Sequence, residues 1–162
     1  MKSTEKNIVE AFNLSTNANL IMCQFEYARY DAFNDNHIVE VKYRHKWYDD
    51  MLIEFDKYSF NLLYAHLSDK TFLYLVAHEE HILSFNITKL TQDKYDFKWE
   101  WRQMPTTTEF SINKNKPKFV GYLNVEEADL TLETTSSGNI MLSPVGYLQV
   151  ASGKKLQFAA AE

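Results

Sequence analysis

The sequence contains few of the residues that build disulfides, metal–thiolate centres or phosphate-cradling loops: one cysteine, three prolines and four glycines in 162 residues. The lone Cys23 can form no disulfide within the chain, and it excludes a zinc ribbon, which needs paired Cys-x-x-Cys ligands. None of the glycines stands in a phosphate-cradling pattern, which excludes a P-loop and a dinucleotide-binding fingerprint. No Gly-x-Ser-x-Gly occurs, so an esterase nucleophile elbow is unsupported.

Long apolar runs and an excess of positive charge are also missing. No run approaches the ~18 residues that indicate a membrane-spanning helix, and no signal peptide is recognisable. We therefore expect no membrane association and a cytoplasmic location, a reducing compartment that suits an unpaired cysteine. The net charge of −5 argues against an indiscriminate electrostatic grip on nucleic acid. It leaves room for a site where bound ions neutralise acidic side chains.

The composition is that of a packed globular protein, with 45% hydrophobic residues and an aromatic share of 15%. A chain of this length suggests one domain with a sizeable core. We expect the core to comprise residues 1–127. Residues 128–162 change in character and predict a β appendage or a poorly ordered tail of the same domain.

Hydrophobic periodicity predicts an α/β fold, with α+β character and a mixed sheet. Two helices are predicted. The first covers residues 4–14, and the second begins at Asp49 or Asp50 and ends at Leu67. The predicted strands cover residues 20–30, 37–44, 71–78, 81–88 and 95–102, with weaker strands near the C-terminus. Asn34-Asp35-Asn36 is a strong turn signal, so the first two strands should form a hairpin.

The stretch from Tyr30 to Tyr43 carries the most chemistry. Asp31 lies just before the turn, and the strand after it contains Glu40-Val41-Lys42. Side chains alternate along a strand, so Glu40 and Lys42 project from the same face about 7 Å apart. Carboxylates beside a lysine suit a hard cation such as Mg²⁺, which takes one or two carboxylates and completes its shell with water and phosphate oxygens. Asp35 at the turn tip is the alternative acid, and we favour Asp31 because a tip residue usually faces water.

This arrangement resembles the PD-(D/E)xK nuclease superfamily. The resemblance rests on Asp31 followed nine positions later by Glu40-Val41-Lys42, and on the order of helix, strand, acid, strand and long helix. Glu10, on the first helix, matches the further carboxylate of small resolvase-like and phage members. Tyr30 stands where the motif has proline. The resemblance spans roughly residues 4–88, about half of the chain.

The resemblance implies a restriction-endonuclease-like core and an endonuclease that uses Mg²⁺ or Mn²⁺ to hydrolyse DNA, with branched or structured DNA as a candidate substrate. Asp31, Glu40 and the Val41 carbonyl are the implied metal ligands, and Glu10 would hold a second ion or a metal-bound water. Lys42 would position the attacking water. A homodimer is one open alternative for the oligomeric state.

Candidate nucleic-acid contacts are the cations near this motif and near the predicted edge strand: Arg44, Lys46, Lys57, Lys114, Lys116 and Lys118. Lys57 resembles the polar residue that many relatives donate from the helix after the motif, and a helical pair with Glu54 is its alternative. Two other functions stay open: a catalytically inactive nuclease-fold protein that binds nucleic acid or a protein partner, and a β-rich interaction module in which Glu40 and Lys42 form an ordinary strand pair.

Overall fold

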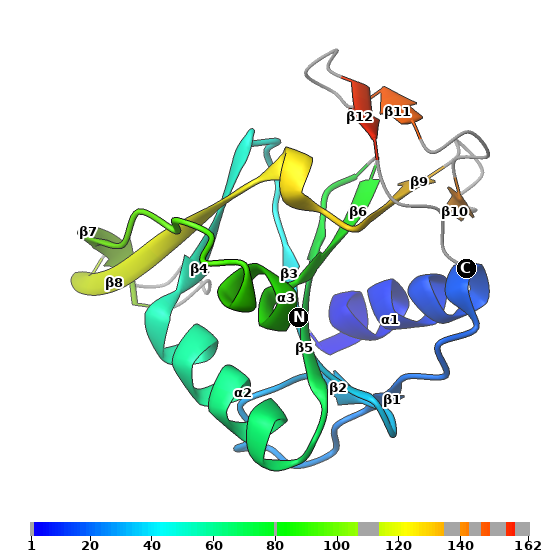
Figure 1. Cartoon of the computed structure of the whole chain (residues 1–162), viewed down its shortest axis with the longest axis horizontal. Helices are drawn as coiled ribbons and strands as arrows, with labels where there is room; N and C mark the ends of the chain where they lie inside the picture. Colours follow the sequence, from blue (N-terminus) through cyan, green and yellow to red (C-terminus); the bar gives the residue numbers. More distant parts are fainter. Residues whose placement is uncertain are drawn as a thin grey trace.

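The protein is built on a mixed β-sheet with helices on both faces (Figure 1). The computed structural model describes residues 2–79, 81–106, 114–134, 140–142, 147–149 and 155–157. Within this part of the chain the main sheet has seven strands in the order β1-β2-β3-β5-β6-β9-β10. Their bounds are β1 Ile21–Met22, β2 Ala32–Phe33, β3 His37–Tyr43, β5 Thr71–Ala77, β6 His81–Asn86, β9 Leu130–Thr134 and β10 Ile140–Leu142.

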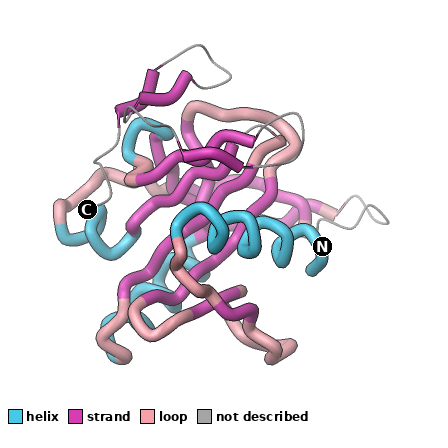
Figure 2. Tube along the Cα trace, turned by 90° about the vertical axis from the view of Figure 1, so that its right-hand side faces the viewer, coloured by secondary structure: helices cyan, strands magenta, loops and turns pink. Residues whose placement is uncertain are grey.

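The centre of this sheet is the parallel pair β3–β5, which is flanked by antiparallel partners and confirms the predicted mixed sheet. Both strands are largely apolar, as expected for strands covered on both faces. Helix α1, Lys2–Thr16, covers one face, where Val9 and Phe12 pack with Val39 and Val41. Figure 2 shows α1 lying across the strands.

Helices α2, Phe55–Leu67, and α3, Ile87–Gln92, cover the opposite face. Ile38 and Phe72 belong to the core on this side, together with Met51 and Ile53 from a second, smaller sheet. Alternation along β3 therefore sends Ile38, and with it Glu40, towards α2.

The second sheet has the strand order β4-β8-β7 and projects from the main body as an arm (Figure 1). Its strands are β4 Asp50–Glu54, β8 Asn115–Asn124 and β7 Glu100–Pro105. β4 runs directly into α2, so the arm and the helix are joined at Glu54 and Phe55. The remaining described elements are the 3₁₀ turn η1, Val125–Glu127, and the paired strands β11, Tyr147–Gln149, and β12, Lys155–Gln157.

Four predicted elements differ from the observed ones. The segment expected to open the second helix is the strand β4, because Met51 and Ile53 alternate with more exposed residues and pair with β8. The predicted strand 20–30 is only β1, followed by a loop. The strand expected over 95–102 begins at Glu100, because Lys98 has φ 53° and donates its N–H to the Asp96 carboxylate in a turn.

The fourth difference lies at the end of β6, where the predicted strand 81–88 stops at Asn86 and α3 follows. The Asn86 side chain accepts a hydrogen bond from the Lys89 N–H and caps that helix.

The core continues beyond residue 127, where the sequence predicted its end. β9 pairs with β6 in the main sheet, and Leu132 is fully buried against the α1 side of the core. β9 is therefore a core strand and not part of an appendage. Much of the predicted segment 128–162 lies outside the described residues. Among the described helices, none combines the length and the apolar character needed to cross a bilayer.

The arm is held against α2 by an aromatic cluster in which Gly121 leaves space for Trp99. A Cβ placed on Gly121 would lie 2.8 Å from two atoms of the Trp99 ring. We therefore expect Gly121→Ala to lower the free energy of unfolding by about 1–3 kcal/mol through overpacking. Urea titration measures this difference. In a Trp99→Leu background the cost of the same substitution should shrink, and an undiminished cost there would contradict the assignment.

Candidate functional site

The predicted acids meet at the edge of β3, where its pairing with β2 ends. The Asp31 N–H donates to the Val39 carbonyl at 2.8 Å, and the Asp31 Oδ2 accepts a hydrogen bond from the Val41 N–H at 2.7 Å. A side chain thus takes the place of a strand partner at Val41. The N–H and C=O of one strand residue point to the same edge, so the Val41 carbonyl lies on the side of the Asp31 carboxylate.

Glu40 is buried on the α2 face of the sheet, with 8% of its surface exposed. The Lys57 ammonium reaches it from α2, with Nζ 3.1 Å from Oε1 and 3.2 Å from Oε2. Lys57 therefore faces the acids, as the resemblance implied, and does not pair with Glu54 along the helix. Glu54 instead pairs with Lys118 at 2.8 Å.

The loop that leads into Asp31 is anchored to the same helix. The Arg29 carbonyl accepts hydrogen bonds from Lys57 Nζ and from the Asn61 Nδ2, each at 3.2 Å. Asn61 is fully buried, and the sequence analysis did not single it out. One stretch of α2 therefore holds both the Glu40 side chain and the backbone that positions Asp31.

The acid that α1 contributes to this region is Glu5, and not Glu10 as the sequence predicted. Glu5 is half-buried and interacts electrostatically with Asp31, Lys42 and Lys57. Glu10 is exposed to solvent and pairs with Lys6 at 3.6 Å. Glu5 lies four residues before the buried Val9 and so shares the helix face that packs on the sheet. That spacing is the signal that could have identified it.

The group formed by Glu5, Asp31, Glu40, Lys42 and Lys57 is the candidate site. Burial and the neighbouring Asp31 carboxylate raise the pKa of Glu40 from 4.5 to about 8, in spite of the Lys57 ammonium. Burial also raises the pKa of Asp31, although the Val41 N–H and the ammonium of Lys57 oppose the shift. Two carboxyl groups that both disfavour ionisation form a strained acidic pair that a further cation would stabilise.

The two lysines of the site differ in their electrostatics. Burial and the nearby Arg44 guanidinium lower the pKa of Lys42, and the carboxylates of Glu54 and Glu40 offset only part of this effect. Burial acts in the same direction on Lys57, but the Glu40 and Asp31 carboxylates reverse it and raise the pKa of Lys57. Lys57 therefore retains its proton and its positive charge more strongly than a free lysine, while Lys42 releases its proton more readily.

The donor atoms fit a magnesium-type ion. Asp31, Glu40 and the Val41 carbonyl offer oxygen ligands only, which suits Mg²⁺ or Mn²⁺ and not a thiolate- or imidazole-bound metal. Among the described residues, no three His, Cys, Asp or Glu side chains cluster closely enough to hold a metal by themselves. An ion here would take the rest of its shell from backbone, water and a bound phosphate, as Mg²⁺ commonly does.

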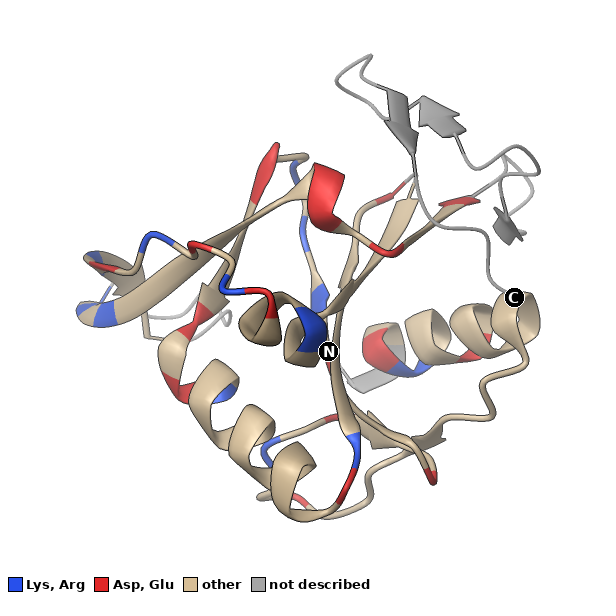
Figure 3. Cartoon of the chain, in the orientation of Figure 1, with Lys and Arg blue, Asp and Glu red and all other residues tan. Residues whose placement is uncertain are grey.

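Of the six predicted nucleic-acid contacts, Lys57 bonds Glu40 instead, and three others lie after β3 or on the arm. Arg44 continues the Glu40–Lys42 face of β3 and donates to the Leu52 carbonyl at 2.9 Å. On the arm, Lys116 and Lys118 alternate along β8, and Arg102 lies opposite Lys118 in the β7–β8 register. Figure 3 shows positions of Lys and Arg in blue on β3 and at the far end of the arm, with acidic positions in red elsewhere on the arm. We call this set, Lys42, Arg44, Arg102, Lys116 and Lys118, the basic face.

The basic face adjoins the site through Lys42, which interacts electrostatically with both Glu54 and Lys118. Arg102 was missed as a contact because a charged residue on a period-two strand suggests only a solvent-facing side. Lys114 and Lys46 are exposed, and the Lys114 carbonyl accepts hydrogen bonds from the Thr106 N–H and hydroxyl, each at 3.0 Å. Asp35, the alternative acid, is exposed at the β2–β3 turn.

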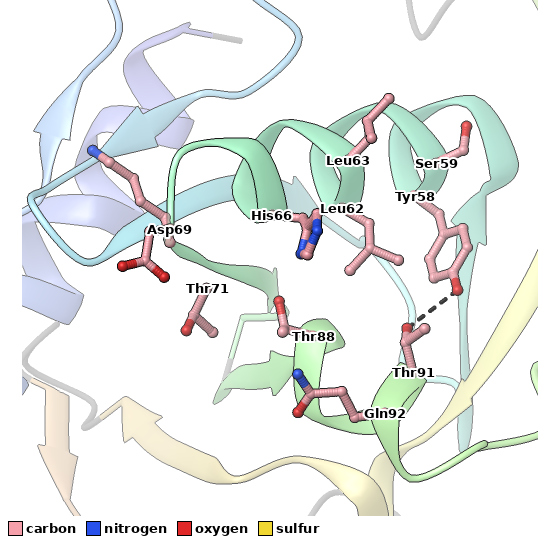
Figure 4. Close-up of a pocket in the computed structure, with 11 residues that line it drawn as sticks. Tyr58, Ser59, Leu62, Leu63, His66, Asp69, Thr71, Thr88, Thr91 and Gln92 are labelled. Atoms are coloured by element: carbon pink, nitrogen blue, oxygen red, sulfur yellow. Dashed lines mark hydrogen bonds between the residues drawn. The ribbon is translucent and has the colours of Figure 1, made fainter.

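A cavity lies away from these residues, between α2 and α3 (Figure 4). Its volume is about 660 Å³, and Tyr58, Leu62 and Thr91 are among its lining residues. Polar groups there already pair within the protein: the Tyr58 and Thr91 hydroxyls lie 3.1 Å apart, and the Thr88 hydroxyl accepts from the Phe72 N–H. None of the acids of the candidate site lines it.

Comparison with known proteins adds no family assignment: no protein-family model matches the sequence, and no curated protein matches it.

The raised pKa of Glu40 predicts a specific pH dependence of stability. The folded state keeps a proton that the unfolded state releases, so this contribution is fully present below pH 4.5 and is lost as the pH rises through about 8. Glu40→Gln retains the shape but does not ionise. In metal-free buffer, we compare the free energy of unfolding of this variant with that of the natural protein. The difference, variant minus natural, should increase by on the order of 2–4 kcal/mol between pH 5 and pH 9.

Denaturant titrations at several pH values measure this gain, with Glu10→Gln as the matched control on an exposed acid. A difference between Glu40→Gln and the natural protein that does not change with pH would contradict the assignment.

Proposed function

We propose that this protein is a Mg²⁺- or Mn²⁺-dependent nuclease with a restriction-endonuclease-like core and DNA as its substrate. The observation that carries the proposal is the convergence of Asp31, Glu40 and Lys42 at one edge of β3. These are the residues on which the resemblance to the PD-(D/E)xK nucleases rests. Helix α1 adds a further acid, Glu5, and helix α2 adds a cation, Lys57, which are the two kinds of residue that the resemblance implies beside the motif.

Asp31, Glu40 and the Val41 carbonyl would hold the ion. When bound, such an ion supplies Lewis-acid stabilisation of the phosphodiester and lowers the pKa of water. Lys42 projects from the same strand face as Glu40 and would orient the attacking water or stabilise charge on the phosphate. Its lowered pKa eases proton exchange with that water. Glu5 would accept a hydrogen bond from a water on the α1 side.

The basic face supports nucleic acid as the substrate. The protein is acidic overall, with a net charge of −5, yet a group of cations extends from the site to the arm: Lys42, Arg44, Arg102, Lys116 and Lys118. The carboxylates of Glu54 and Glu100 lie among them, and Glu54 pairs with Lys118 at 2.8 Å. Phosphate contacts from such cations position a nucleic acid without reading its sequence. Branched or structured DNA is the substrate class that the resemblance to resolvase-like members favours.

A second candidate is a binding protein that has kept this core without catalysis. The observation that favours it is the Lys57 ammonium, which lies 3.1 Å from the Glu40 carboxyl group and already supplies positive charge there without a metal. The two candidates differ in their response to divalent ions. Calorimetry that detects no Mg²⁺ or Mn²⁺ binding at millimolar concentration, together with no cleavage, would favour the binding protein.

The test of catalysis uses plasmid and branched DNA incubated with Mg²⁺ or Mn²⁺. We expect Glu40→Ala and Lys42→Ala each to reduce cleavage at least about 100-fold, because each removes a group that stabilises the transition state. EDTA should abolish cleavage. Cleavage that persists unchanged in both variants would remove the site from consideration.

The two helical acids provide a matched pair within the same assay. Glu5→Gln should lower the cleavage rate, because Glu5 lies beside Asp31 and Lys42, whereas Glu10→Gln should leave it within about twofold. The opposite ranking would restore the assignment of Glu10 that the sequence alone favoured.

A further inference from the structure

A small pocket opens on the basic face next to the candidate site. Its volume is about 160 Å³, and it is lined by Arg44, Tyr48, Asp50, Leu52, Arg102, Met104 and Tyr122. Ligand sites for drug-sized molecules measure roughly 300–1,000 Å³, so this pocket suits a single ring system. We call it the arm pocket.

The arm pocket lies on the same side of the molecule as the site. Glu40 and Lys42 project from one face of β3, and Arg44 follows directly after its end, where its N–H still donates to the Ala77 carbonyl of β5. Extended backbone puts Arg44 roughly 13 Å from Glu40. Leu52 is paired with Tyr122 in the β4–β8 register, and this pair joins the pocket to the arm. A strand of nucleic acid that lies along this face with one phosphate beside the Lys42 ammonium would therefore bring a nearby nucleotide to the pocket.

The polar groups of the arm pocket are held in place before any ligand binds. Arg44 Nη2 donates to the Leu52 carbonyl at 2.9 Å, and Arg102 Nη1 donates to the Tyr122 hydroxyl at 3.1 Å. The Tyr122 hydroxyl in turn donates to the Glu100 carboxylate at 2.5 Å. A guanidinium has five N–H donors, so each arginine keeps donors for a ligand beyond these contacts.

The chemistry of the lining favours a nucleobase over a phosphate. Asp50 lines the same pocket, and its carboxylate repels an anion but accepts hydrogen bonds from a neutral ligand. Tyr48, of which 52% is exposed, offers a ring for stacking. Guanine presents the O6 and N7 acceptors that arginine recognises, together with ring and amino N–H donors for a carboxylate.

We propose that the arm pocket binds one unpaired guanine of the substrate strand, near the scissile phosphate. This inference rests on the proposed function for its substrate, a nucleic acid, but not on cleavage. Guanine can offer its Watson–Crick edge to Asp50 only when it is unpaired, so the pocket selects single-stranded or distorted regions. The substrate class is then nucleic acid with an unpaired purine beside the cut.

The test measures binding without cleavage. Fluorescence anisotropy in EDTA compares a short thymidine oligonucleotide with the same oligonucleotide carrying a single guanine. We expect the guanine to tighten binding by about 5- to 100-fold, since a bidentate base contact discriminates by ~1–3 kcal/mol. Tyr48→Ala and Arg102→Ala should each remove most of that preference, and Asp50→Asn should remove the distinction between guanine and inosine, which lacks the amino group.

Trp101→Ala is the matched control. Trp101 is an exposed aromatic residue next to Arg102, on the opposite face of β7, where its ring packs against Phe119 at a centroid distance of 5.2 Å and a tilt of 33°. This variant should keep the guanine preference, and circular dichroism should show that all variants fold.

Equal affinity for the two oligonucleotides, binding to neither, or a preference that survives both Tyr48→Ala and Arg102→Ala would overturn the inference. Metal-dependent cleavage by a protein that shows no guanine preference would overturn this inference alone. A guanine preference in a protein that cleaves nothing would instead overturn the proposed nuclease and leave the pocket assigned.

Discussion

The structure depends on how a carboxylate is accommodated inside a sheet that is covered on both faces. Glu40 lies between Val39 and Val41 on a central strand, and burial of an unpaired charge there would be costly. Lys57 offsets this cost from α2, and its ammonium also contacts the Arg29 carbonyl. Strand, helix and loop are therefore tied at one point. A buried ion pair is weak support for stability, so its presence is better explained by function.

The second constraint is the shortness of β2. Because this strand has only two residues, the edge of β3 is left open at Val41, and the Asp31 side chain bonds there in place of a strand partner. A carboxylate and a backbone carbonyl can meet in this opening, beside Glu40 and the acid that α1 contributes. The basic face continues from this edge along the arm. It gathers positive charge locally although the net charge of the protein is −5, since local and net charge differ.

Much of the fold follows from patterns that the sequence displays. The turn at Asn34, the strand with Glu-x-Lys and the buried run of β5 were predictable from local chemistry. The start of α2 was not, since Met51 stands at helical spacing from Phe55 and Tyr58 and also at strand spacing from Ile53. The pairing of β4 with β8, about 70 residues later, decides between them, and no local signal carries that information.

The candidate site divides in the same way. The sequence by itself determined that Glu40 and Lys42 share a strand face, because alternation is a property of the extended backbone. Only the tertiary structure decided that Glu5 and not Glu10 reaches Asp31, that Lys57 bonds Glu40 and not Glu54, and that Arg102 joins the basic face. Each of these depends on how one element rotates and packs against another, which is set by burial of the whole core and not by the spacing of residues within one segment.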